Sequence, residues 1–466
     1  MTTVFSHDQV HAQAAVALLA SAVRGPVFEP GDPGYAEEVA GFNVAHTPAA
    51  AVVVGATCTA DVAAAVRFAR ASGRRVAVQA TGHGLTDELF GTVLVSTRRM
   101  DALSIDSLNR RATVGAGVRW RAVLDAAAPH GLAPLCGSSS QVGVVGFTTG
   151  GGLGPFARRY GFAADHVRRF TIVTADGAVR EVDENTTGPD ADLFWAVRGG
   201  KGNFGIVTEI EFDLVPVTRF VGGAVLFAGE DAAAVLHAWR EWAPTMPEDT
   251  GTSIALLNTP PDPRLPEPIR GRSVVAVRFS TLGTAEEGAA LLAPMRAVAT
   301  PLMDTVGELP YAALDAVHMD PTDPMPTWDR GTSLRELTAD TVDALLAQVG
   351  PGSGTPLAMV ELRLLGGAVA RRPEVPNAVS GRDVAFSVFS VGVLAGPEPQ
   401  RVPAAGAALV EALRPWAAEG GLVNLLGQAS PARVGALWSE ADRERLLEIA
   451  CRVDPEGTFA TNVVIA

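Results

Sequence analysis

The chain has 466 residues, of which 47% are hydrophobic and 19% are charged, so it is long enough for more than one core and too apolar to be disordered. Its formal net charge is −14, and its 37 Lys and Arg residues are scattered rather than gathered into runs, which argues against a nucleic-acid partner. Its three cysteines, Cys58, Cys136 and Cys451, have no paired spacing, so they indicate neither a disulfide framework nor a zinc site and fit a reducing compartment.

Residues 1–25 contain an apolar stretch that lacks a basic start and is interrupted by His and Gln. This pattern predicts an amphipathic helix rather than a signal peptide. No run of about 20 apolar residues follows, so no membrane span is predicted. We therefore expect a soluble, cytoplasmic protein without a membrane partner.

Short strands alternate with helices in the first part of the chain. A buried strand is expected to end at Gly55, a helix to occupy Thr59–Ser72, and further strands to lie at residues 74–80 and 92–97. Another strand and another helix follow. The alternation predicts an α/β lobe over residues 1–218.

Residues 219–420 have a different pattern. Strand-like runs such as residues 221–229 and 384–394 occur without regular helix crossovers. An antiparallel sheet with helices on one face is therefore expected. We interpret this part as a substrate-binding lobe and the chain as a two-lobed protein of the α+β class.

The loop Ala80–Gly84 places His83 between two glycines, Gly82 and Gly84. Neither glycine has a Cβ that would hold a planar ligand away from the backbone. Taken alone, this loop is as consistent with a surface histidine in a glycine turn as with a ligand-binding histidine.

The run Val142–Gly154, VGVVGFTTGGGLG, lies later in the same lobe. Its glycines would let backbone N–H groups approach a phosphate or pyrophosphate closely. A flexible linker is the alternative, but a linker would not carry buried apolar residues between its glycines. Ligand binding is therefore favoured.

The segment Arg198–Thr208 contains a formal G-x-G-x-x-G at Gly200, Gly202 and Gly205. The dinucleotide-binding fingerprint of this form needs a strand before it and a helix after it. Here a probable helix precedes the glycines and an alternating strand follows them. A Rossmann site is therefore not expected.

The motifs TGHG, GVVGFTTGGGLG, VTADG and LFWAVRGGKGNFGIVT occur in this order along the chain. In this order they resemble the FAD-linked oxidases of the berberine-bridge-enzyme-like type, within the vanillyl-alcohol-oxidase superfamily and its p-cresol-methylhydroxylase type of FAD-binding domain. The resemblance spans about residues 40–218 and resumes weakly in Val360–Arg371, Gly420–Gly427 and Asp454–Asn462.

The resemblance implies that residues 1–218 form an FAD-binding lobe, that residues 219–420 lie over the isoalloxazine ring, and that residues 421–466 return to the FAD-binding lobe. His83 matches the histidine that such enzymes bond to the 8α carbon of the flavin. The other residues that the resemblance places at the cofactor are Gly82, Gly84, Ser139, Gly143, Gly146, Gly150, Gly151, Gly152, Gly154, Gly202, Asn203, Gly205, Ile206, Val207 and Asn462.

Two positions depart from the family pattern. Ser139 stands where many relatives carry a second, cysteine tether, and Cys136 lies too early in the chain, so we expect a tether through His83 alone. A shifted loop that uses Cys136 stays an alternative, as does a small buried cysteine. Leu422 stands where relatives often carry a tyrosine base, so either another residue accepts the proton or the reaction needs no base there.

The second lobe offers candidates for that base. Glu361 and Arg363 are two residues apart in an expected strand and share one face. Glu361 is our first catalytic candidate, as acceptor of a proton from a substrate hydroxyl, and a salt-bridged surface pair is an equally good interpretation. Tyr311 is the second, although a buried, hydrogen-bonded tyrosine is the ordinary expectation. His318 is a further candidate, and no metal site is predicted.

These observations predict an FAD-dependent oxidase that transfers hydride from a small organic substrate, a secondary metabolite or a sugar, to flavin N5, with dioxygen as electron acceptor. Two alternatives stay open. One is a flavin-bearing protein that binds a small molecule or confers resistance to it. The other is a non-oxidative cyclase or isomerase that uses the same fold.

Overall fold

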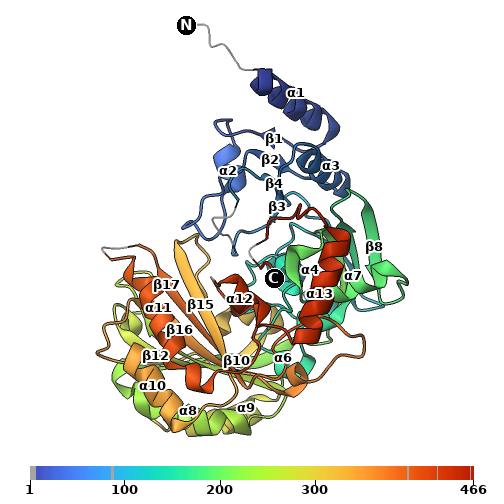
Figure 1. Cartoon of the computed structure of the whole chain (residues 1–466). Coiled ribbons are helices and arrows are strands. Elements are labelled where there is room, and N and C mark those ends of the chain that lie inside the picture. The colour runs from blue at the N-terminus through green and yellow to red at the C-terminus, as the bar shows by residue number, and fades with distance from the viewer. Residues whose placement is uncertain (1–6, 85–88, 396–397, 428, 462, 466) are drawn as a thin grey trace.

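Two lobes lie one above the other in the computed structural model of the chain, and the N-terminal helix lies at the far end of the first lobe (Figure 1). The structure describes residues 7–84, 89–395, 398–427, 429–461 and 463–465, with side chains from residue 13 onward. Helices and antiparallel sheets occur together, which confirms the predicted two-lobed α+β class.

A small parallel sheet begins the first lobe. Its strands follow the order β1-β2-β4-β3, with β2, β4 and β3 parallel and β1 antiparallel to β2. Buried valines of these strands pack against one face of α3. The elements are α1 (His7–Ala22), β1 (Val27–Phe28), α2 (Tyr35–Val39), β2 (Val52–Gly55), α3 (Thr59–Ala71), β3 (Val76–Gln79) and β4 (Val93–Ser96). The helix predicted at Thr59–Ser72 and the strands predicted at residues 74–80 and 92–97 are confirmed.

A second, antiparallel sheet completes this lobe, in the order β5-β6-β9-β7-β8. The predicted alternation of strands and helices is therefore present, but only the first sheet is parallel. The elements are β5 (Leu103–Asp106), β6 (Arg111–Gly115), α4 (Trp120–Ala127), α5 (Val144–Thr148), α6 (Ala157–Tyr160), β7 (Val167–Val173), β8 (Val179–Asp183), α7 (Pro189–Val197) and β9 (Ile206–Asp213).

The second lobe is built on one large antiparallel sheet in the order β13-β10-β12-β11-β16-β17-β15, with β14 beside β10. Helices α8, α9, α10 and α11 cover its outer face (Figure 1). This confirms the predicted sheet with helices on one face. The elements are β10 (Arg219–Ala228), α8 (Ala232–Trp242), β11 (Thr250–Asn258), β12 (Ser273–Thr281), α9 (Ala285–Arg296), β13 (Met303–Asp304), β14 (Gly307–Pro310), β15 (Thr327–Leu334), α10 (Ala339–Val349), β16 (Leu357–Leu364), β17 (Phe386–Val393) and α11 (Arg401–Ala412).

Strand β16 shows how this sheet separates apolar from polar side chains. Val360, Leu362 and Leu364 pack into the core under the helices. Because successive side chains of a strand point to opposite faces, Glu361 and Arg363 lie on the other face. That face looks toward the first lobe and carries the polar groups of the candidate site.

The C-terminal part of the chain contacts both lobes. Helices α12 (Pro431–Gly435) and α13 (Glu440–Val453) precede a segment in which Phe459 forms a parallel bridge with Val76 of β3. The Asn203 side-chain amide donates to the Val463 carbonyl over 2.8 Å. The boundaries at residues 218 and 420 stay predictions.

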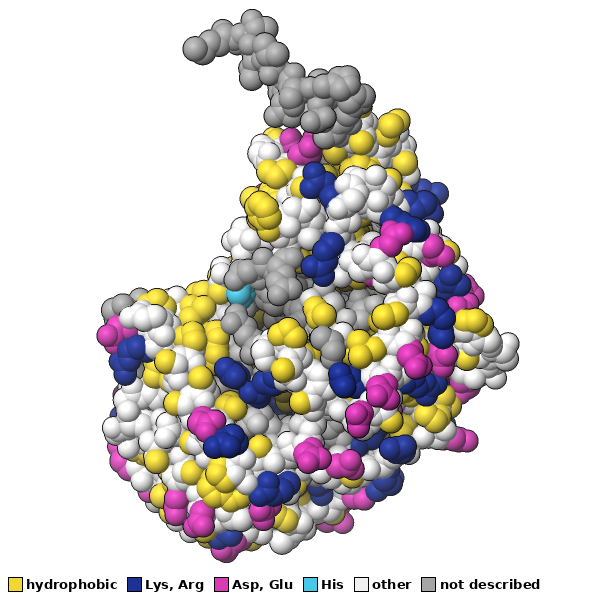
Figure 2. Space-filling model, viewed as in Figure 1, with side chains coloured by type: hydrophobic (Ala, Val, Ile, Leu, Met, Phe, Trp, Pro, Cys, Tyr) yellow, Lys and Arg dark blue, Asp and Glu magenta, His cyan; other side chains and the backbone are white. Residues whose placement is uncertain are grey.

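No helix in the described ranges is long and apolar enough to cross a membrane. The visible face of the molecule carries acidic and basic side chains side by side (Figure 2).

Arg158 of α6 joins the two lobes. Its Nε donates to the Thr250 carbonyl over 3.0 Å and its Nη2 to the Met246 carbonyl over 2.8 Å, and its Nη1 bonds the Leu365 carbonyl. Burial lowers the pKa of this guanidinium. One side chain of the first lobe thus satisfies three backbone acceptors of the second.

We predict that Arg158→Met lowers the free energy of unfolding by about 3 kcal/mol, because three part-buried carbonyls lose a charged donor. Urea denaturation followed by circular dichroism measures the change. The matched control is Arg159→Met, since the neighbouring Arg159 side chain is exposed. Equal stability of the two variants would contradict the role given to Arg158.

Candidate functional site

The loop after β3 presents backbone N–H groups to a ligand. The carbonyls of Thr81 and Gly82 accept hydrogen bonds from the N–H groups of Phe42 and Asn43, over 2.9 and 3.2 Å. Gly82 is buried and has a φ of 69°, a conformation that favours glycine. Within the described residues, the N–H groups of Thr81, Gly82 and His83 have no acceptor.

The beginning of the glycine run lies against this loop. A Cβ added to Gly143 would lie 3.4 Å from Cγ2 of Thr81, whereas one added to Gly146 would meet no atom within 4 Å. In the part of the chain that the structure describes, the N–H groups of Gly143, Val145 and Gly146 also lack acceptors. The His83 loop and the beginning of α5 thus lie side by side with N–H groups that the described residues leave unpaired, an arrangement that suits the phosphate groups of a dinucleotide.

His83 is held in a defined orientation at this loop. Its Nδ1 lies 2.9 Å from the Thr81 hydroxyl, and its ring stacks on Phe42 with centroids 4.2 Å apart. Burial lowers the pKa of His83 to about 4, and the positive charge of Arg119 adds to this, while Asp320 acts in the opposite direction. The imidazole is therefore neutral at neutral pH and keeps a nitrogen lone pair.

A segment of the second lobe is tied to the chain just before the glycine run. The Ser138 hydroxyl donates to Asp320 over 2.6 Å, and the backbone and hydroxyl of Ser140 donate to Asp315 over 2.7 and 2.6 Å. His318 lies between these two aspartates in the sequence. The contacts therefore fix the position of His318 relative to the first lobe.

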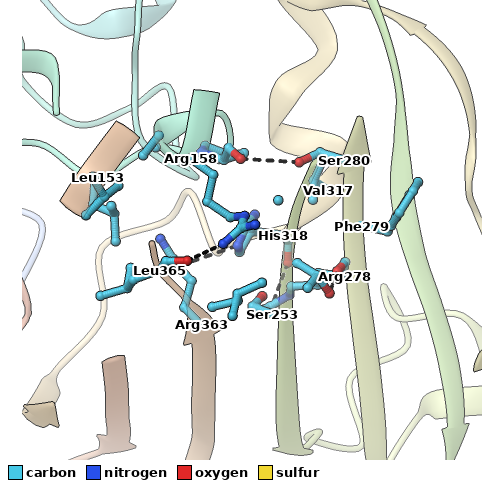
Figure 3. Close-up of a pocket in the computed structure, with 17 residues that line it drawn as sticks. Leu153, Arg158, Ser253, Arg278, Phe279, Ser280, Val317, His318, Arg363 and Leu365 are labelled. Atoms are coloured by element: carbon cyan, nitrogen blue, oxygen red, sulfur yellow. Dashed lines mark hydrogen bonds between the residues drawn. The ribbon is translucent and has the colours of Figure 1, made fainter. Parts of the chain in front are cut away.

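A cavity lies where the end of the glycine run meets the polar face of the large sheet (Figure 3). It can hold the centre of a water-sized sphere over about 20 Å³, which corresponds to a group slightly larger than one water molecule. Arginine, histidine and hydroxyl side chains line it together with apolar ones. The lining residues are Leu153, Gly154, Pro155, Ala157, Arg158, Gly251, Thr252, Ser253, Arg278, Phe279, Ser280, Val317, His318, Arg363, Leu364, Leu365 and Val369.

Glu361 lies behind the cavity wall, and both of its carboxylate oxygens are occupied. Oε1 accepts hydrogen bonds from Arg278 Nη1 and the Ser253 hydroxyl, each over 2.7 Å. Oε2 accepts one from Arg363 Nη2 over 2.6 Å. Burial alone would raise the pKa of Glu361, but the two guanidiniums outweigh burial and hold this pKa well below its usual range.

These contacts correct the catalytic role that we predicted for Glu361. A carboxylate shared by two arginines is a poor proton acceptor. It is also absent from the described residues that line the cavity. The geometry instead gives Glu361 the role of holding other side chains in place.

His318 is the side chain that Glu361 orients toward the cavity. It is 7% exposed, and its Nε2 lies 3.3 Å from Oε1 of Glu361. Burial, with the nearby charge of Arg278, lowers the pKa of His318, so the ring is neutral at neutral pH. Among the described residues, its Nδ1 has no hydrogen-bond partner. If Nε2–H donates to the carboxylate, Nδ1 carries the lone pair.

Tyr311 lies away from this cavity, contrary to the catalytic role predicted for it. It begins a 3₁₀ helix (Tyr311–Val317) and packs beside Phe156 and Phe220. Its hydroxyl donates to the Pro134 carbonyl over 2.9 Å. This buried, hydrogen-bonded position makes Tyr311 a residue of the core.

The remaining predicted positions divide between open and tightly packed ones. A Cβ at Gly202 would meet only Thr461, at 3.9 Å, whereas a Cβ at any of several other glycines would collide with neighbouring atoms. These tightly packed glycines are Gly150, Gly152, Gly154 and Gly205. At Gly151 the φ of +102° also favours glycine. The other glycine of the motif, Gly84, is exposed, and Ser139 is half-buried.

Ile206 and Val207 begin β9, next to the Lys201–Asn203 turn. Asn203 donates to the carbonyls of Gly200 and Val463, so it fastens the C-terminal segment. Asn462 lies outside the described residues.

Cys136 is buried, and burial raises the pKa of its thiol to about 12, with Asp315 adding to the effect. The thiol therefore stays protonated, which disfavours a second covalent tether. A Cβ added to Gly154 would lie 2.2 Å from the Cys136 carbonyl oxygen, so the segment around Cys136 packs directly against the end of the glycine run.

Arg158, Arg278 and Ser253 were not predicted from the sequence. Arg278 interrupts the otherwise apolar strand β12, and a charged residue in a buried strand is the signal that could have identified it. In the described chain no group of three or more His, Cys, Asp or Glu side chains is arranged to hold a metal ion.

Comparisons with known proteins agree with this geometry. Residues 50–183 match the model of a FAD binding domain. The chain is 30% identical to (R)-6-hydroxynicotine oxidase of Paenarthrobacter nicotinovorans over 240 residues, which is 51% of this chain and 48%, about half, of that protein. It is 27% identical to the uncharacterized FAD-linked oxidoreductase YvdP of Bacillus subtilis over 450 residues, 93% of this chain and 96% of the relative.

Among solved structures, wild-type BBE-like 1 of Physcomitrella patens superimposes with a TM-score of 0.81 at 19% identity, covering 97% of this chain and 99% of the other. At this identity the likeness shows the fold alone. These findings confirm the predicted FAD-binding domain and the two-lobed fold.

We predict that Glu361→Gln lowers the free energy of unfolding by about 3–5 kcal/mol at neutral pH, because two buried guanidiniums lose their counter-charge. The pKa of Glu361 is depressed in the folded state, so its stabilisation is present above the unfolded pKa of about 4.3 and is lost as the pH falls toward the folded value. The difference from the wild type should therefore shrink below that pH.

Denaturation curves from neutral pH down to acid check this. The control is Glu248→Gln, whose carboxylate pairs with Arg371 at the surface and should contribute about 1 kcal/mol or less. A pH-independent loss in Glu361→Gln would contradict the assignment.

Proposed function

We propose that this chain, an FAD-linked oxidoreductase with the fold of the berberine-bridge-enzyme-like oxidases, carries FAD bonded to His83 and oxidises a small organic substrate at the cavity beside His318. The observation that carries the proposal is the neutral His83, held by Thr81 next to backbone N–H groups that have no acceptor among the described residues. These groups suit a flavin dinucleotide better than a structural turn, because a turn would pair its own donors.

The His83 loop and the beginning of the glycine run would together hold the cofactor. The N–H groups of Gly82, His83, Gly143 and Gly146 would bind the pyrophosphate. A ring nitrogen of His83 would form the covalent bond to the 8α carbon in place of a C–H bond; the proton would be lost, and the two electrons would pass to the flavin and then to dioxygen. The protonated Cys136 would take no part in it. When bound, FAD supplies an acceptor for a hydride from the substrate carbon.

His318 would take the substrate proton in the same reaction. Its Nδ1 has no partner among the described residues and the ring lines the cavity, so a substrate hydroxyl can donate to it. Glu361 would act through His318 as a positioning residue, since it fixes the ring and stabilises the imidazolium that forms. This arrangement supplies the base that Leu422 cannot.

The nicotine oxidase and the other flavoprotein relatives support a small-molecule substrate for this chain. Dioxygen as electron acceptor and a cytoplasmic location are parts of the same proposal. The scarcity of cysteines supports the location.

In His83→Ala, the flavin should be lost from the denatured chain. The wild type, denatured in acid, should keep one FAD per chain by mass spectrometry and stay fluorescent on a denaturing gel, whereas the variant should release all of its flavin. Cys136→Ala is the control and should keep the adduct. Flavin released entirely from the denatured wild type would contradict the tether.

In His318→Asn, the rate of anaerobic flavin bleaching by a substrate found by screening should fall by about 10²–10⁴-fold, because the proton acceptor is gone. The flavin content should not change. The control is His130→Asn, whose side chain is exposed. If His318 is the base, the fall of the wild-type rate at low pH, where the base becomes protonated, should be absent from the residual rate of the variant. If His318 has only a structural role, the residual rate should depend on pH as the wild-type rate does.

A further inference from the structure

The cavity beside His318 has an excess of positive charge. Arg158, Arg278 and Arg363 line it, and no acidic residue of the described chain does. Glu361 lies behind the wall and supplies one negative charge, shared between Arg278 and Arg363. Arg158 bonds only backbone carbonyls. Arg278 and Arg363 therefore carry one net positive charge between them after Glu361 is counted.

Such an excess is costly in the absence of a ligand. A buried charge needs a counter-charge or full hydrogen bonding, because the interior solvates it poorly. Arg278 and Arg363 have side chains that are 5% and 13% exposed, so water solvates them little. An anion that entered the cavity would relieve this cost.

Donors for such an anion are already in place. Within the described residues, Arg363 Nε–H has no hydrogen-bond acceptor. Arg363 lines the cavity, and Figure 3 labels Arg278 and His318 among the other lining residues. A planar carboxylate matches the fork of a guanidinium, and its charge strengthens each hydrogen bond.

The small volume of the cavity favours a carboxylate over larger anions. A space of about 20 Å³ for the centre of a water-sized sphere fits a carboxylate group better than the bulkier phosphoryl group. The apolar side chains of Leu153, Val317, Leu365 and Val369 complete the wall. Because these four side chains offer no hydrogen bonds, we expect the part of the substrate that adjoins the carboxylate to be apolar.

We propose that the cavity binds the carboxylate group of the substrate, so that this protein acts on small carboxylic acids with an apolar body. The inference rests on the proposed function, because it names the substrate class of the same site. Arg363 and Arg278 bind the carboxylate, and His318 stays available for the neighbouring hydroxyl.

The test is isothermal titration calorimetry on the flavin-loaded protein at constant ionic strength, with benzoate, phenylacetate and acetate as carboxylate probes. Benzamide is the matched neutral probe, since it shares the shape of benzoate without its charge, and inorganic phosphate is the alternative anion. We expect benzoate to bind at least about tenfold more tightly than benzamide, because only benzoate neutralises the guanidiniums.

The variant Arg363→Met should weaken benzoate binding at least about tenfold and leave benzamide binding unchanged. Arg371→Met, at an exposed arginine paired with Glu248, is the control and should bind both probes as the wild type does. Should Arg363→Met fail to fold, Arg363→Lys replaces it. This variant keeps the charge that Glu361 needs but loses the Nε donor, so benzoate binding should still weaken.

Three results would overturn the inference. The first is benzamide binding as tightly as benzoate. The second is unchanged benzoate binding in the folded Arg363 variant. The third is that no carboxylate probe binds, whether or not phosphate does. Flavin content is measured in the same samples. Loss of carboxylate binding with flavin present defeats this inference alone, whereas carboxylate binding by a chain that never carries flavin defeats the proposed function.

Discussion

The carboxylate of Glu361 is shared by Arg278, Arg363 and His318 on the inner face of the large sheet. Removing Glu361 would leave two buried guanidiniums without a counter-charge, whereas removing one arginine would leave a single buried ion pair. The alternation of β16 places Glu361 and Arg363 on the face opposite the helix-covered core. The positions of the groups that line the cavity follow from this constraint.

The first lobe reaches the same cavity through different contacts. Arg158 bonds carbonyls of the second lobe, while Ser138 and Ser140 bond the aspartates on either side of His318. The glycine run, whose first residues lie against the His83 loop, ends at Leu153 and Gly154 in the cavity wall. A ligand held at His83 and a substrate held at Arg363 are therefore positioned by one connected set of contacts.

Local pattern was sufficient for much of the fold. The helix at Thr59, the alternating strand after Gly205 and the antiparallel second lobe follow from periodicity, and motif order indicated the FAD-binding domain. The site was less predictable, because its groups come from strands that are distant in sequence. Glu361 and Arg363 were visible as a pair, but β11 and β12 supply the partners Ser253 and Arg278, and only the sheet order β12-β11-β16 brings them together. The catalytic role of Tyr311 was predicted wrongly for a similar reason. Its hydroxyl donates to the carbonyl of Pro134, which is distant in the sequence.

The central claim is that FAD and substrate meet at the inner face of the large sheet, between His83 and the Glu361 cluster. A crystal structure of the flavin-loaded protein soaked with benzoate tests it most directly. We expect electron density that continues from the His83 ring into the flavin, an isoalloxazine ring facing His318, and a carboxylate within hydrogen-bond distance of Arg363. A flavin ring that lies away from the β11–β12–β16 face, with benzoate bound elsewhere, would contradict the account.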